Sequence, residues 1–185
     1  MRIFFPLMAI IMALTFAQAL ASAKKPKPVT IDSARVITVD RYFSQYSFGP
    51  ALRMYIFEQQ KAVIRILFTS EGRKIMPLGQ LVIFSPATSQ DGVDQWINNQ
   101  HSDAIFGDAP KPVVKHDLTG NIQITEQRFL GQITGRAGET YEKYYVTFTV
   151  SSIATDGVTI EGFEDNVDVH VMTKDSPALQ RPDLP

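Results

Sequence analysis

Apolar and polar side chains alternate along much of the chain, which is the period of a half-buried β-strand. The clearest run covers residues 142–152, where Tyr144, Val146, Phe148 and Val150 fall on one side. The intervening positions are mostly Thr, Ser and Tyr, so one face of this strand is predicted to pack on a core while the other meets water.

Turn-forming residues divide the C-terminal part into further strands. Asp156-Gly157 favours a tight hairpin because glycine accepts a positive φ, and residues 158–160 return as a strand. A second turn is predicted at residues 164–166, Glu-Asp-Asn, before valines alternate again over residues 167–171. We therefore predict a C-terminal meander of at least three strands.

The first half of the chain repeats the strand pattern with more burial. Residues 62–68 are apolar on both faces except at Arg65, which is typical of a central strand. Residues 58–61 form a plausible hairpin loop before it, and residues 71–73 a turn after it. Further strands are predicted at residues 29–39, 52–57 and 81–84.

One segment has the helical period instead. A hydroxyl residue at 88–89 is predicted to cap a helix that runs to about residue 99. Val93, Trp96 and Ile97 share one face of it, so we expect the helix to lay Trp96 and Ile97 against a sheet.

A loop is predicted at residues 98–103 after this helix. Strands then resume near residue 113, and Gly131, Gly135 and Gly138 are expected in or beside a turn. The fold class predicted from these elements is α+β and strand-dominated, as an antiparallel β-sandwich or an open barrel-like sheet with one short helix.

The N-terminus has the order of a secretory signal peptide. Met1-Arg2 is followed by an apolar run over residues 3–16 and by Ala21-Ser22-Ala23, a small-x-small cleavage pattern. The run is shorter than the roughly 20 residues of a membrane-spanning helix, although a retained anchor is the alternative. The rest of the chain has no second long apolar run, so we predict an exported chain, periplasmic or secreted, with no membrane-spanning helix after cleavage.

The domain organisation follows from these segments. Residues 1–23 are the signal peptide, residues 24–28 a basic, Pro-rich stub, residues 29–174 a single β-rich domain, and residues 175–185 a disordered tail.

Composition removes several kinds of chemistry. The chain has no cysteine, which excludes disulfides, thiol nucleophiles and cysteine-based metal sites. The formal net charge of -1 gives nucleic acid no electrostatic attraction. The glycine-rich loops that hold nucleotide phosphates are also missing, so no cofactor is predicted.

Three histidines are the candidates for catalysis or metal binding. His101 is followed by Ser102 and Asp103, but neighbours in sequence point apart, so a polar loop explains them as well. Asp168 and His170 share one strand face at about 7 Å, from two residues of strand rise. Two ligands are too few for zinc, so we predict no metal site and keep this pair as the nearest candidate.

Aromatic side chains are the candidates for binding. Tyr42, Tyr46 and Phe48 share strand parity, and exposed rings give rigid contact surfaces for sugars, peptides or proteins. We predict that these three and Trp96 are binding residues, with ordinary core packing as the alternative.

The function predicted from the sequence is a soluble, exported, β-rich binding or envelope-assembly module without catalytic activity. Its partner is an unidentified protein, peptide or carbohydrate of the cell envelope. The alternatives are a small hydrolytic or metal-dependent exported enzyme that uses His101, His116 or His170, and a small outer-membrane β-barrel, which the chain length and alternation also permit.

Overall fold

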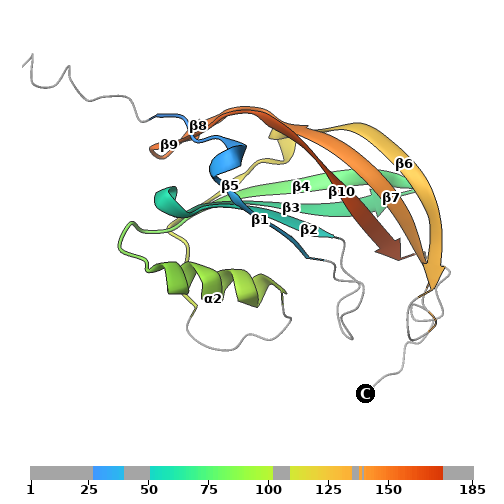
Figure 1. The fold of residues 1–185 in the computed structure, drawn as a ribbon, viewed down its shortest axis with the longest axis horizontal. Helices are drawn as coiled ribbons and strands as arrows, with labels where there is room; N and C mark the ends of the chain where they lie inside the picture. Colours follow the sequence, from blue (N-terminus) through green and yellow to red (C-terminus); the bar gives the residue numbers. More distant parts are fainter. Residues whose placement is uncertain (1–26, 40–50, 102–108, 135–137, 139, 173–185) are drawn as a thin grey trace, which may run out of the picture.

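The computed structural model describes residues 27–39, 51–101, 109–134, 138 and 140–172. Strands dominate these residues, every named strand pairs antiparallel with its neighbours, and one α-helix is present among them. The predicted α+β, strand-dominated class is therefore confirmed (Figure 1).

The first half of the chain forms a five-stranded sheet in the order β1-β2-β3-β4-β5. Its strands are β1 (Arg35–Val39), β2 (Leu52–Phe57), β3 (Ala62–Glu71), β4 (Lys74–Ile83) and β5 (Val114–Asp117). A short 3-10 turn, η1 (Ile31–Ser33), precedes β1 and interrupts the strand predicted there, and η3 (Glu58–Gln60) joins β2 to β3 at the predicted loop. Gly72 and Arg73 both have positive φ angles and form the β3–β4 turn, within the turn predicted at residues 71–73. Strand β4 begins directly after this turn, at Lys74, and not at residue 81 as predicted.

The second half forms a three-stranded sheet in the order β10-β7-β6 and a separate two-stranded hairpin. The strands of the sheet are β6 (Ile122–Thr134), β7 (Thr140–Val150) and β10 (Phe163–Met172). The hairpin consists of β8 (Ile153–Thr155) and β9 (Val158–Ile160), joined at Asp156-Gly157 as predicted, and η4 (Thr119–Asn121) leads from β5 into β6.

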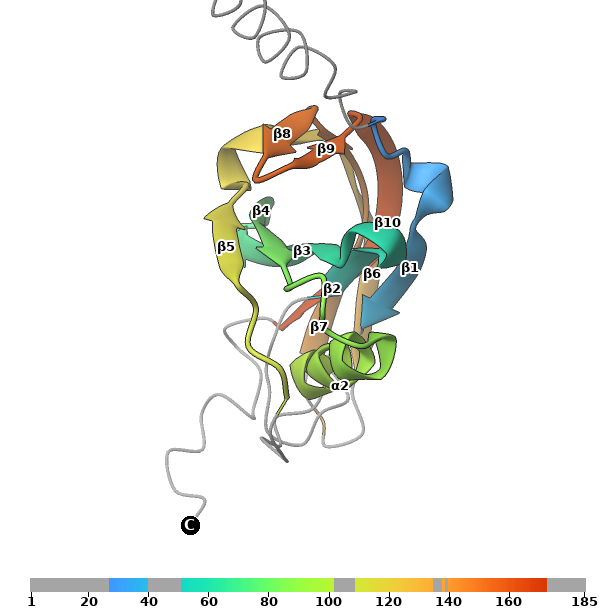
Figure 2. The ribbon, with the colours of Figure 1, turned by 90° about the vertical axis from the view of Figure 1, so that its left-hand side faces the viewer.

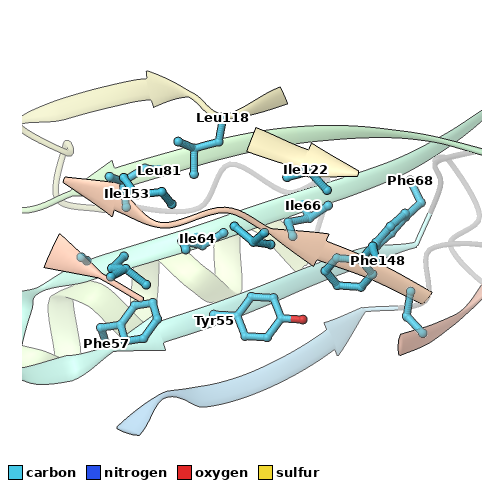
Figure 3. Close-up of a cluster of buried hydrophobic side chains, with 14 of the residues drawn as sticks. Tyr55, Phe57, Ile64, Ile66, Phe68, Leu81, Leu118, Ile122, Phe148 and Ile153 are labelled. Atoms are coloured by element: carbon cyan, nitrogen blue, oxygen red, sulfur yellow. The ribbon is translucent and has the colours of Figure 1, made fainter. Parts of the chain in front are cut away.

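The main hydrophobic core lies between the two larger sheets. β2, β3 and β4 contribute one side of it, and β7 contributes Tyr144, Val146, Phe148 and Val150, the set predicted from alternation. Figure 3 shows Phe68 of β3 against Phe148, and their ring centroids are 5.3 Å apart. The shared core is what holds the two sheets together.

The helix covers the other face of the five-stranded sheet. Helix α2 (Gln90–His101) begins after Ser89, whose Oγ accepts a hydrogen bond from the Gly92 N–H at 3.0 Å, as the predicted cap requires. Val93, Trp96 and Ile97 form a second core with β2 and Phe84. Figure 2 shows α2 and the β8–β9 hairpin on opposite sides of the five-stranded sheet.

One prediction about the helix region is corrected by these bounds. The predicted loop at residues 98–103 is wrong as far as His101, because α2 continues through that residue. No helix in the described ranges is long and apolar enough to cross a membrane.

The predicted turn at residues 164–166 and the predicted meander are both wrong. Residues 164–166 lie inside β10, and β10 pairs with β7 rather than with β9. The β8–β9 hairpin is therefore inserted in the sequence between β7 and β10, which are adjacent strands of one sheet. The polar run was misleading because Asp165 is a half-buried partner of Arg53 and Tyr55 across the core, not a turn residue.

Gly79 of β4 gives a first test of how closely the sheets approach. A Cβ placed on Gly79 would lie 2.3 Å from the Ile122 Cδ1 and 3.1 Å from the Leu118 backbone carbon. Gly79→Ala is therefore expected to lower the free energy of unfolding by about 1–3 kcal/mol in urea denaturation. Gly120→Ala is the control, because a Cβ there meets no atom within 4 Å; equal effects of the two changes would contradict the packing.

Candidate functional site

An open cleft lies between the β3–β4 hairpin and the β6–β7 ribbon. It is lined by Arg73, Gln127, Phe129 and Tyr144, and its volume is about 270 Å³. In Figure 1 the β6–β7 ribbon bends at its far end, past the ends of β3 and β4. Pockets for drug-sized ligands span roughly 300–1,000 Å³, so this cleft suits one side chain or a similarly small group.

Irregularities in β6 accompany two exposed apolar side chains, of which Phe129 lines the cleft. The register between β6 and β7 shifts between Ile124 and Glu126 and again between Phe129 and Gly131. Such bulges bend a strand and redirect its side chains. Phe129 and Leu130 are 54% and 45% exposed. Gly131, which the sequence placed in or beside a turn, instead lies within β6 at the second bulge, where its φ of 133° suits only glycine.

Gln127 fixes one wall of the cleft to the β3–β4 hairpin. Its side-chain Oε1 accepts a hydrogen bond from the Ile75 N–H at 2.8 Å, and its Nε2 donates to the Arg73 carbonyl at 2.6 Å. A single side chain therefore satisfies two backbone groups at the edge of β4 and sets the spacing between the two walls.

Tyr144 forms the floor. Its ring lies 5.5 Å from that of Phe129, and its Oη donates a hydrogen bond to Glu142 Oε2 at 2.6 Å. Burial raises the pKa of Tyr144 to about 12, and the hydrogen bond to Glu142 adds to the rise. The hydroxyl therefore stays protonated at neutral pH and serves as a fixed donor.

Arg73 supplies positive charge at the rim. Its Nε is 3.5 Å from Glu142 Oε1, while its side chain is 81% exposed. The cleft thus combines two aromatic rings with an accessible guanidinium. This combination suits an apolar group that has an anionic neighbour.

Of the binding residues predicted from the sequence, Trp96 alone is among the residues that the structure describes, and it lies away from the cleft. Trp96 is 6% exposed and packs edge-on against Phe84, with ring centroids 5.3 Å apart, so it belongs to the layer between α2 and the sheet. Tyr42, Tyr46 and Phe48 lie outside the residues that the structure describes, as do the predicted signal peptide and tail.

The described histidines lie on different sheets. His116 of β5 pairs with Asp156 at the β8–β9 turn, and His170 of β10 is 9% exposed. His101 ends α2, and its side chain lies outside the described part. Among the described residues, no three side chains with metal-ligand chemistry gather in one place.

Asp168 and His170 do share a strand face, as predicted. Lys143 Nζ lies 2.7 Å from Asp168 Oδ2, and Lys143 is also the residue opposite His170 in the β7–β10 register. An ammonium group at this position opposes a bound metal cation by like-charge repulsion.

The cleft residues were missed because their local pattern is that of an ordinary strand. Tyr144 was assigned to the apolar face, which is correct, but Phe129, Gln127 and Arg73 were not singled out. One feature of the sequence could have indicated the cleft: Phe129-Leu130 is an apolar pair within an otherwise polar stretch and next to a glycine.

Comparison with known proteins gives no match: no family model, curated protein or solved structure corresponds to this chain.

Proposed function

We propose that this chain is an exported binding module of the cell envelope, and that it contacts its partner through the cleft formed by Arg73, Gln127, Phe129 and Tyr144. The observation that carries the proposal is the 54% exposure of Phe129 in a cleft with a fixed wall and floor, next in sequence to the exposed Leu130. Adjacent exposed apolar residues beside a concavity are typical of contact sites, whereas isolated ones are ordinary.

The composition of the cleft supports binding to a polypeptide. Two aromatic rings offer apolar contact area, and the exposed Arg73 side chain offers a charged hydrogen-bond donor at the edge. Aromatic residues and arginine are the types most enriched among residues that dominate binding energy at protein interfaces. The signal-like N-terminus supports an envelope location for the partner.

Selection from random linear peptides displayed on phage tests this function. Peptides enriched on the purified chain are expected to bind Phe129→Ser about tenfold more weakly, because the serine removes the apolar contact. The control is Val113→Ser, which removes an exposed apolar side chain (65%) outside the cleft and leaves binding unchanged. Fluorescence anisotropy of labelled peptides measures the affinity for both variants. A lack of enriched peptides, or equal binding to Phe129→Ser, would count against the proposal.

A further inference from the structure

Strand β6 is the outer strand of its sheet, since the order is β10-β7-β6. An outer strand presents backbone N–H and C=O groups that another strand can pair with. The Ser151 N–H donates to the Asn121 carbonyl, so the odd-numbered residues of β7 direct their backbone groups toward β6. The register of β6 on β7 then leaves Phe129, Gln132 and Thr134 with backbone groups directed away from β7.

The outward groups of β6 lie beside the cleft. Phe129 contributes its side chain to the cleft and its backbone to the strand edge. A strand added to this edge would therefore place every second side chain on the cleft side. The cleft has room for one of these, and the exposed guanidinium of Arg73 lies at its rim.

Two other edges in the described part of the chain, those of β10 and of the first half of β4, carry features that discourage pairing. β10 carries Glu164 and Asp168 on its exposed face, and β4 has Pro77 at an outward position between Ile75 and Gly79. Charges and proline are common means of protecting an edge. Residues 129–134 of β6, Phe-Leu-Gly-Gln-Ile-Thr, contain neither.

We propose that residues 129–134 of β6 accept an extended segment of another polypeptide as an additional strand. One apolar side chain of this segment enters the cleft against Phe129 and Tyr144, and an acidic side chain two positions away pairs with Arg73. The inference rests on the proposed function and specifies the partner's chemistry. Strand addition of this kind takes its affinity from main-chain hydrogen bonds and its specificity from pockets for alternate side chains.

The same features favour a different polypeptide over a second copy of this chain. Residues 129–134 contain no acidic side chain, so a second β6 strand offers nothing in that stretch to pair with Arg73. An acidic group on the partner is what complements the exposed guanidinium.

Gln132→Pro tests the strand edge directly. Proline removes the outward N–H of residue 132 without removing a hydrogen bond between β6 and β7. Phage-selected peptides are expected to bind this variant about tenfold more weakly than they bind Gln132→Ala. Gln132→Ala keeps the backbone N–H and so measures the contribution of the Gln132 side chain to the affinity. The selected peptides are also expected to carry Asp or Glu two positions from an aromatic or aliphatic residue.

N-methylation of a selected peptide gives a second measurement that leaves the protein unchanged. Methyl groups on alternate residues, those facing β6, are expected to weaken binding about tenfold, whereas methyl groups on the intervening residues leave it unchanged. If thermal unfolding shows that Gln132→Pro does not fold, this measurement alone tests whether the peptide adds to β6 as a strand.

The outcomes separate this inference from the proposed function. Peptides that lose affinity for Phe129→Ser but tolerate Gln132→Pro and every N-methyl position would overturn strand addition and leave the cleft as a binding site. A lack of peptide binding overturns both. A dimer in analytical ultracentrifugation that Gln132→Pro converts to a monomer would make a second copy the occupant and overturn the inference.

Discussion

Replacing Phe148 by alanine is expected to lower the free energy of unfolding by about 3–5 kcal/mol, the usual cost of removing a buried phenylalanine. Phe148 is fully buried between the two sheets and packs against Phe68. The truncation removes apolar contact area and leaves a cavity that the rigid sheets cannot fill. Urea denaturation followed by the fluorescence of Trp96, the single tryptophan, measures the change.

The matched control for Phe148→Ala is Phe129→Ala, which removes the same side chain from an exposed position. Its expected cost is below about 1 kcal/mol, because a ring that remains in water contributes little to folding. A cost similar to that of Phe148→Ala would show that Phe129 is packed, and would contradict the open cleft.

Asp165→Ala is expected to lower the free energy of unfolding by about 2–4 kcal/mol at neutral pH. The Oδ2 of Asp165 accepts hydrogen bonds from Tyr55 Oη at 2.5 Å and from Arg53 Nη2 at 2.6 Å. These contacts join β10 to β2 and so link the two sheets. Alanine leaves the buried Tyr55 hydroxyl and the half-buried Arg53 guanidinium without this acceptor.

The contribution of Asp165 is expected to depend on pH. Burial by itself raises the pKa of Asp165, but the hydrogen bonds from Tyr55 and Arg53 outweigh it and hold the pKa below its ordinary value. The unfolded chain, with an aspartate pKa near 3.9, therefore takes up the proton first as the pH falls. The stabilisation is complete above about pH 5 and is lost progressively below pH 4.

Urea denaturation between pH 3 and pH 7 measures this dependence. The stabilities of the unmodified chain and Asp165→Ala should converge toward acid pH. Asp168→Ala is the control, since Asp168 is an exposed acidic residue of the same strand that pairs with Lys143, and its expected cost is at most about 1 kcal/mol. A constant difference between the chain and Asp165→Ala across this range would contradict the role of the ionised carboxylate.

Much of the fold was predictable because its signals are local. The alternation around Phe148 identified the buried face of β7, Asp156-Gly157 identified the β8–β9 turn, and the spacing of Trp96 and Ile97 identified the face of α2 that packs on the sheet. Each of these features is determined by neighbouring residues.

The failures involve interactions between distant residues. Asp165 looks like a turn residue until Tyr55 is known to lie against it, and the two are 110 positions apart in the sequence. The bulge before Gly131 exists only in the pairing of β6 with β7. The cleft depends on that bulge and on the position of the β3–β4 hairpin, so it could not be found from the sequence of β6 alone.

The two hydrogen bonds of Gln127 have a kinetic consequence for the cleft. They hold the β3–β4 hairpin against β6 before any partner arrives. The proposed docking of a partner strand would then require little rearrangement of this protein, and the entropy lost on association would come mainly from the incoming chain. Differences in affinity among partners should accordingly lie in how slowly they leave rather than in how fast they arrive.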